Sequence, residues 1–238
     1  MRCIYPLTFR FKPHWVMILI TVLSVVLFLR LGFWQLHRAS EKKQMIAALN
    51  SFAQQKPKLW NAKDSLPAQY QPLVVEGHFL SSTLLLDNQH HQHQFGYDVL
   101  TPLLLANGHV IIVDRGFVSA DVTRQTFPVI HNPSTPIRLT GKAYYPSDKN
   151  WILGQGIEQK KADLAIVERL DVHLMSQFLH KSVYPFIIRL DFQAANGFVR
   201  EWPVVAMSPE RHYGYALQWF AMAFIILIIF IALNLKKI

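Results

Sequence analysis

The chain has 238 residues, of which 51% are hydrophobic and only 16% are charged. Because soluble domains usually carry about 25% charged residues, part of this apolar excess is predicted to face lipid. An aromatic content of 13% excludes a disordered chain, and a single cysteine, Cys3, excludes a disulfide scaffold.

The net charge of +9 does not indicate a nucleic-acid-binding protein once the charges are located along the chain. All 15 acidic residues lie between Glu41 and Glu210. Basic residues crowd the edges of two apolar segments, where they act as determinants of membrane topology. These are Arg2, Arg10, Lys12 and Arg30 near one end of the chain, and Lys236 and Lys237 at the other. We therefore expect a lipid bilayer as a partner and no nucleic acid.

The first apolar segment begins at Trp15 and continues through Trp34. This is the length of about 20 residues that a helix needs to span a bilayer. A cleaved signal peptide is the alternative, but no small-x-small cleavage site follows the apolar run, so we predict an uncleaved anchor.

The second apolar segment runs from Tyr213 to Leu233 and is followed by two lysines. Two spans place both termini on the same side, and the basic residues at the chain ends favour the cytoplasmic side for both. The sequence thus predicts a protein of the bacterial inner membrane with five parts. These are a cytoplasmic tail at 1–13, a transmembrane helix at 14–34, a periplasmic domain at 35–211, a second transmembrane helix at 212–235, and a cytoplasmic tail at 236–238.

Between the spans the periodicity changes from helical to extended. A helix over 31–53 leaves the membrane, and a second helix is predicted over 163–179, with Asp163 as its cap. Asn107-Gly108 predicts a type I′ hairpin turn. Segments rich in Val, Ile and Leu predict strands at 71–80, 82–89, 96–106, 109–119, 138–145 and 184–192. The expected fold class is a membrane protein whose two transmembrane helices flank one β-rich, antiparallel α+β extramembrane domain.

Signatures of enzymes are missing from the sequence. There is no G-x-S-x-G elbow, the single cysteine excludes C-x-x-C, and Gly154-Gln155-Gly156 lacks the third glycine of a dinucleotide loop. We therefore expect a protein that is not an enzyme and has no catalytic residues.

Two groups of histidines are candidate ligands. His90, His91 and His93 fall within four residues in a predicted loop, where a solvated turn is the simpler interpretation and a metal site the weaker one. His212 begins the second span, with Tyr215 or Ala216 and then Trp219 on the same helical face. An interfacial aromatic belt explains this pattern, and an axial haem ligand explains it as well.

The segment LGFWQLHRASEK after the first span resembles the G-x-W-Q-x-x-R signature of Surfeit locus protein 1, the Shy-type cytochrome c oxidase assembly factors. The segments EGHF, FGYDVLTPLLL, VIIVDRGFVS and RLTGKA follow in order, and H-x-x-Y-x-x-x-W opens the second span. The resemblance covers residues 28 to 235. It departs at Asp114, where the family more often has Asn, and at the histidine-rich segment. The signature positions are Gly32, Trp34, Gln35, Arg38, Arg115 and Gly116.

The resemblance implies a role in maturing haem–copper oxidase, in which the protein receives haem a near the membrane surface and helps to place it in the catalytic subunit. It also implies haem a synthase as a partner. The family's haem-linked histidine falls on His212, with Trp219 and Tyr215 as neighbours. Arg211 is a candidate partner of a haem propionate, because guanidinium groups bind carboxylates in a bidentate way.

Structural roles are expected for both groups of signature residues, the group after the first span and the group in the extramembrane domain. Arg115 follows a strand and is expected to pair with Asp98 or another acid, while Gly116 is expected to allow a β-bulge. The alternative function is a membrane-tethered periplasmic scaffold for oxidase subunits that never binds haem.

Overall fold

The computed structural model describes residues 9–52, 54–146, 156–203, 205 and 207–237. It divides the chain into a helical unit, formed by residues 1–47 and 204–238, and a sheet unit, formed by residues 48–203. Two terminal helices thus flank a sheet-rich domain, which confirms the expected fold class.

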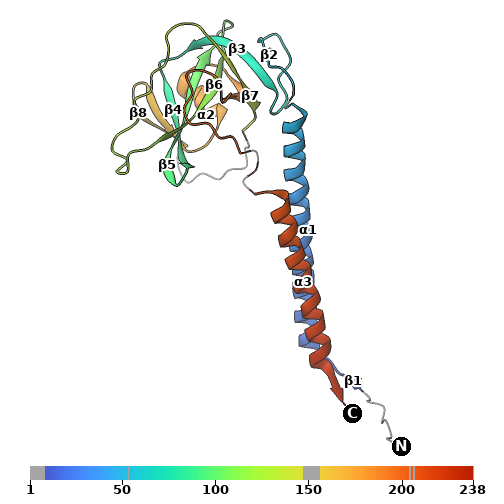
Figure 1. Ribbon diagram of the computed structural model, residues 1–238. Coiled ribbons are helices and arrows are strands. Elements are labelled where there is room, and N and C mark those ends of the chain that lie inside the picture. The colour runs from blue at the N-terminus through green and yellow to red at the C-terminus, as the bar shows by residue number, and fades with distance from the viewer. Residues whose placement is uncertain (1–8, 53, 147–155, 204, 206, 238) are drawn as a thin grey trace, which may run out of the picture. The chain divides into compact units, whose positions relative to one another are not determined.

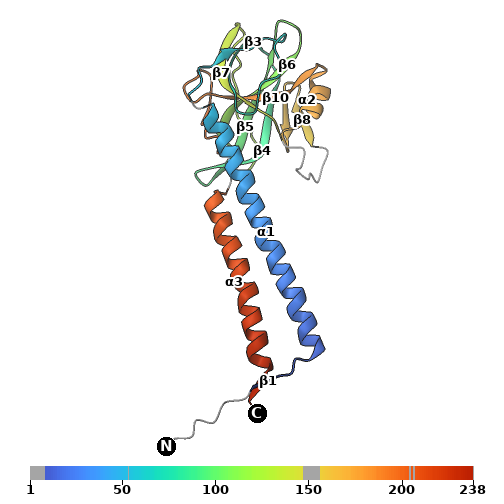
Figure 2. The same ribbon diagram turned by 90° about the vertical axis from the view of Figure 1, so that its right-hand side faces the viewer.

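The helical unit contains most of α1 (Trp15–Ser51) and all of α3 (Pro209–Asn234), drawn in blue and orange-red in Figures 1 and 2. Both helices are long and apolar enough to cross a membrane. Their apolar side chains are mostly exposed within the unit, as Trp15 and Leu217 illustrate at 68% and 71%. Because a helix in a soluble core would bury such side chains, these surfaces are suited to lipid.

A short two-stranded ribbon joins the N-terminal end of α1 to the C-terminal end of α3. Strand β1 (Phe9–Phe11) pairs antiparallel with β11 (Leu235–Lys237), which follows α3 directly. The ring of Phe11 meets the ring of Phe230 edge to face, with centroids 5.8 Å apart. The two terminal segments are therefore held together at the end of the pair.

The sheet unit is built on a closed ring of five strands. Each strand pairs with the next in the order β3, β7, β10, β6 and β5, and β5 returns to pair with β3. All these pairings are antiparallel except that of β10 with β6. The ring strands are β3 (Pro72–Phe79), β5 (Gln94–Leu104), β6 (Val110–Ser119), β7 (Ile137–Tyr144) and β10 (Val183–Leu190).

Alternating side chains divide the unit into two main cores. Ile111, Val113 and Ile188 belong to one cluster, whereas Val110 and Ile112 belong to the other. This alternation follows from the period of two in a strand, and it explains why these strands are apolar along nearly their whole length.

Four further elements extend the ring. Strand β2 (Lys58–Leu59) pairs with β3, while β4 (Thr83–His91), β9 (Leu164–Val167) and β8 (Ile157–Lys161) continue the sheet beyond β5. Helix α2 (Val172–Leu179) packs against β10 and buries Met175 in the second core. All six predicted strand segments are present in the structure.

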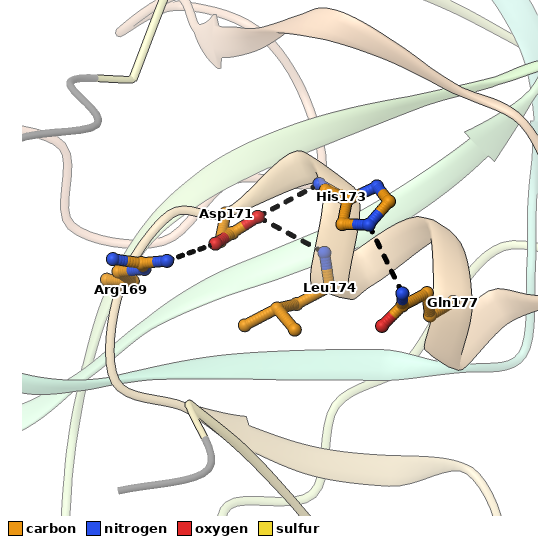
Figure 3. Close-up of polar contacts among 5 residues, drawn as sticks. All are labelled: Arg169, Asp171, His173, Leu174 and Gln177. Atoms are coloured by element: carbon orange, nitrogen blue, oxygen red, sulfur yellow. Dashed lines mark hydrogen bonds and ion pairs between the residues drawn. The ribbon is translucent and has the colours of Figure 1, made fainter. Parts of the chain in front are cut away.

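The helix predicted over 163–179 is wrong in its first half. Residues 164–167 form β9, which pairs in parallel with β4, and the helix begins only at Val172. The cap is Asp171 rather than Asp163. Its Oδ1 accepts the main-chain N–H groups of His173 and Leu174, and the Arg169 guanidinium contacts its other oxygen (Figure 3). A run of apolar residues at mixed spacing fits a buried strand as well as a helix, and here the unpaired edge of β4 selects the strand.

The hairpin around Asn107-Gly108 is present, but its turn is not type I′. Only Gly108 has a positive φ, at 82°, and its N–H donates to the carbonyl of Leu105. The Asn107 side chain accepts the N–H of His109 at 3.1 Å. Asparagine thus works here as a hydrogen-bonding turn residue, and a left-handed glycine follows the turn.

Candidate functional site

His212 lies one turn into α3, on the face that packs against α1. Only 7% of the residue is exposed. Its Nδ1 lies 2.7 Å from Oε1 of Gln35, and its Nε2 is buried without a hydrogen-bond partner among the described residues. An amide oxygen can only accept, so this contact is a hydrogen bond when Nδ1 carries a proton. In the neutral ring, Nε2 is then the nitrogen with the lone pair.

Small residues bring the two helices close together around this contact. Gly32 is buried on α1, and a Cβ added there would lie 2.5 Å from the ring of Phe220. Ala216 and Ala223 are buried on α3, one and three turns beyond His212. Because the helices meet through glycine and alanine, polar side chains of ordinary length can reach across the interface.

The other candidate haem neighbours are spread over more than one face of α3. Ala216, rather than Tyr215, shares the buried face with His212, and Tyr215 is 44% exposed. Trp219 is partly buried and stacks on Phe28 of α1, with ring centroids 5.7 Å apart. Arg211 is exposed. His212 therefore contacts Gln35 of α1, and Trp219 contacts α1 about two turns closer to the C-terminal end of α3.

The remaining residues of the first signature have different surroundings. Trp34 is 52% exposed, as expected for a side chain that faces outward from α1. The Arg38 guanidinium donates to Glu41 one turn along the same helix, at 2.7 Å. The sequence predicted a structural role for Gln35 but did not identify its partner, which lies 177 residues away along the chain.

Arg115 does not pair with Asp98, contrary to the prediction. It is 3% exposed, and its Nε donates to the carbonyl of Asn196 at 2.6 Å. Its Nη atoms donate to Thr101, Asn132 and the His131 carbonyl. Arg115 follows Ile111 and Val113 on the same side of β6, so it points away from Asp98. Burial lowers the pKa of the guanidinium to about 10, and the group keeps its charge at neutral pH.

Gly116 lies in a β-bulge of β6. The pairing with β5 shifts register here, and Gly116 has a φ of 104°. A Cβ at this position would lie 2.4 Å from the carbonyl oxygen of Val199. The bulge turns the strand and leaves room for the segment around Val199, which bonds to Phe117.

A buried acidic pair on the opposite side of β6 escaped the sequence analysis. Asp114 is 1% exposed and lies opposite Arg189 in the pairing of β6 with β10. Burial raises its pKa well above the usual range, and the charge of Asp98 raises it further. Burial also raises the pKa of Asp98 to about 6, against the lowering effect of Arg189. The Arg189 guanidinium lies 3.6 Å from the centre of the Tyr144 ring.

The histidine-rich segment is a tight hairpin rather than a loop. His90 and His91 belong to β4, and the turn consists of Gln92 and His93, both with positive φ. His91 lies 3.6 Å from Glu201. Among the described residues no group of three or more His, Cys, Asp or Glu side chains is arranged to hold a metal ion. The geometry therefore gives no support to the weaker metal-site interpretation.

Comparisons with known proteins agree with the resemblance noted in the sequence. The SURF1 family matches residues 22–224. A SURF1-like protein of Rickettsia felis is 25% identical over 90% of this chain and 94% of its own length. A SURF1-like protein of Monosiga brevicollis is 23% identical over 87% of this chain and 83% of its own length. One from Rickettsia bellii is 33% identical over 43% of this chain and 42% of its own. The family is one of oxidase assembly factors rather than of enzymes, and this chain, with its two apolar terminal helices and the sheet unit between them, belongs to the SURF1 family.

Proposed function

We propose that this protein binds haem a at its helix pair and helps to place it in the catalytic subunit of a haem–copper oxidase. The observation that carries the proposal is the buried Nε2 of His212, which has no hydrogen-bond partner among the described residues. A neutral imidazole in this state is the usual protein ligand of haem iron. In this function haem a is cargo, received from haem a synthase and passed to the oxidase.

The surroundings of His212 suit a large, flat and mainly apolar molecule. Trp219 and Phe28 form an aromatic pair deeper in the same helices. Arg211, next to the ligand in sequence, is exposed and carries the planar guanidinium that binds a propionate best. Tyr215 is exposed on the adjacent face of α3, where it can contact the edge of a bound ring system.

His212→Ala is expected to remove haem from the purified protein. The variant deletes the iron ligand but should leave the helices in place, because alanine is a strong helix former. The measurement is the Soret absorbance of full-length protein purified from cells that make haem a. His37→Ala is the matched control, since His37 is exposed on α1 and lies next to Glu41 of the same helix, at 3.3 Å. Unchanged haem content in His212→Ala would show that the ligand lies elsewhere.

The same spectrum separates this proposal from its alternative. A membrane-tethered scaffold for oxidase subunits would have no Soret band in the unmodified protein. It would also give no role to the unpartnered nitrogen of His212. A family of oxidase assembly factors is compatible with either function, so the haem content of the purified protein decides between them.

We further propose that both termini are cytoplasmic and that the sheet unit is periplasmic in a bacterial inner membrane. The basic residues at the chain ends support this orientation. Val122 is 99% exposed in a turn of the sheet unit. Val122→Cys in a Cys3→Ser background should react with a membrane-impermeant maleimide in spheroplasts. Reaction only after the membrane has been opened would reverse the orientation.

A further inference from the structure

The hydrogen bond at Nδ1 of His212 is formed by Gln35, for which the sequence predicts only a structural role. Resting on the proposed function, we propose that Gln35 is a positioning residue, which fixes the tautomer of His212 and strengthens its donation to haem iron. Gln35 acts through the histidine and need not touch the haem itself.

The geometry gives Gln35 this role through a single contact. Gln35 and Gly32 are separated by three positions on α1, so both face α3. The Gln35 oxygen lies 2.7 Å from Nδ1 of His212. Because this oxygen cannot donate, the contact is favourable only when Nδ1 is protonated. In the neutral ring the lone pair is then confined to Nε2, the nitrogen without a hydrogen-bond partner in the part of the chain that the structure describes.

Burial makes this contact important. His212 is 7% exposed, so water does not readily replace a lost hydrogen-bond acceptor at Nδ1. Without Gln35 the ring can rotate, and the tautomer with its proton on Nε2 becomes competitive. That tautomer cannot bind iron through Nε2. Partners of this kind behind metal-bound histidines typically change metal affinity by about 10–100-fold when they are removed.

Gly32, three positions before Gln35 on α1, allows the two helices to approach as closely as this contact requires. A side chain at Gly32 would collide with the ring of Phe220, which also meets Phe33 edge to face at 5.4 Å. Gly32 lies about one turn from Gln35, so the close approach of the helices fixes the reach of the amide. Gly32 and Gln35 of the signature thus both lie at the interface between α1 and α3.

Two substitutions at Gln35 separate positioning from mere packing. Gln35→Met keeps the length of the side chain and removes the acceptor, so we expect haem to bind about 10–100-fold more weakly. Gln35→Glu keeps an acceptor oxygen and places a negatively charged carboxylate next to Nδ1 of His212, which makes the imidazole more electron-rich. A more electron-rich imidazole favours ferric iron, so the midpoint potential of bound haem should fall in Gln35→Glu and rise in Gln35→Met. A purely structural role would not move the potential in opposite directions.

Gln218→Met is the matched control, because Gln218 lies on α3 and is exposed. A readout without haem is also available, since the ¹⁵N shifts of the His212 ring in the apo protein report its tautomer. These resonances are assigned by their loss in His212→Ala. We expect a protonated Nδ1 in the unmodified protein and a mixture of tautomers in Gln35→Met.

The possible outcomes distinguish this inference from the proposed function. If His212→Ala loses haem while Gln35→Met keeps unmodified affinity, potential and tautomer, the role of Gln35 is overturned and the haem site stands. If His212→Ala itself keeps haem, the proposed function fails and the inference fails with it. If Gln35→Met does not fold, the sign of the potential shift in Gln35→Glu decides.

Discussion

Arg115→Leu is expected to lower the free energy of unfolding of the sheet unit by on the order of 3 kcal/mol or more. The guanidinium bonds to Thr101 and Asn132 and to the main-chain carbonyls of His131 and Asn196. Leucine fills part of the volume but leaves these acceptors unsatisfied in a buried place. Each such acceptor costs about 1–3 kcal/mol, although relaxation of the loops recovers some of this.

The loss is magnified because Arg115 connects separate parts of the unit. Its cation lies 5.1 Å from the ring centre of Phe79 and 4.9 Å from that of Phe198, which come from β3 and from the segment before α3. Asn132, one of its partners, in turn donates to the carbonyl of Leu80. Removal of the guanidinium therefore releases two loops from the strands, and the effect should appear as a single cooperative loss of stability.

Thermal unfolding of the full-length protein in mild detergent measures this effect, with tryptophan fluorescence as the signal. About 3 kcal/mol corresponds to a fall in Tm of roughly 10 °C for a unit of this size. Arg138→Leu is the control, because Arg138 is exposed and meets Glu76 only at 3.5 Å, an ion pair worth at most about 1 kcal/mol. Equal Tm values for the two variants would show that Arg115 is not a structural link.

The strands were predictable because each is a short apolar run between turn residues, and this pattern depends only on nearby sequence. The segment 163–179 failed because its first four apolar residues pair with β4, a strand about 80 positions earlier. The partners of Arg115 escaped for a similar reason. Two of these partners are main-chain carbonyls, which every residue has, so the sequence does not indicate which of them bind Arg115. An acidic residue such as Asp98 can be recognised in the sequence, and it was therefore predicted as the partner.

The candidate site was predictable in part. His212 was identified from the motif at the start of the second span, and its position on a helix follows from the apolar run. Its burial and its contact with Gln35 depend on which faces of α1 and α3 meet. Both faces are nearly as apolar as the rest of each helix, so periodicity does not mark them. Gly32, Ala216 and Ala223 are the only sequence signal, because small residues mark close contact between membrane helices.

The acidic pair leads to the second large effect, since Asp114 and Asp98 should make the sheet unit less stable as the pH rises. Both carboxyl groups have a raised pKa in the folded protein. Above about pH 4 the unfolded chain releases these protons, while the folded chain keeps them. Stability is therefore highest below the unfolded pKa and is lost as the pH rises. The part due to Asp98 is lost by about pH 6, and the part due to Asp114 continues to higher pH.

Asp114→Asn should remove most of this dependence and raise the Tm of the protein at pH 7.5, because the variant has no carboxyl group to ionise in the buried site. The amide oxygen can still accept the N–H of Gly116, which bonds to Oδ1 at 3.2 Å, and Asp98 remains as the counter-ion of Arg189. With its charged neighbour gone, the pKa of Asp98 should also move back toward its ordinary value. Toward pH 4 the Tm values of the variant and the unmodified protein should converge, because the folded carboxyl group is neutral there and only about half of the unfolded groups are ionised.

The measurement is Tm against pH from 4 to 8, with Asp163→Asn as the matched control, since Asp163 is exposed in the turn before β9. We expect parallel curves for the control and diverging curves for Asp114→Asn. A lower Tm for Asp114→Asn at pH 7.5 would mean that the carboxylate is ionised and bound to Arg189. In that case the two would form a stabilising buried ion pair, and its loss would leave the arginine uncompensated beside the Tyr144 ring.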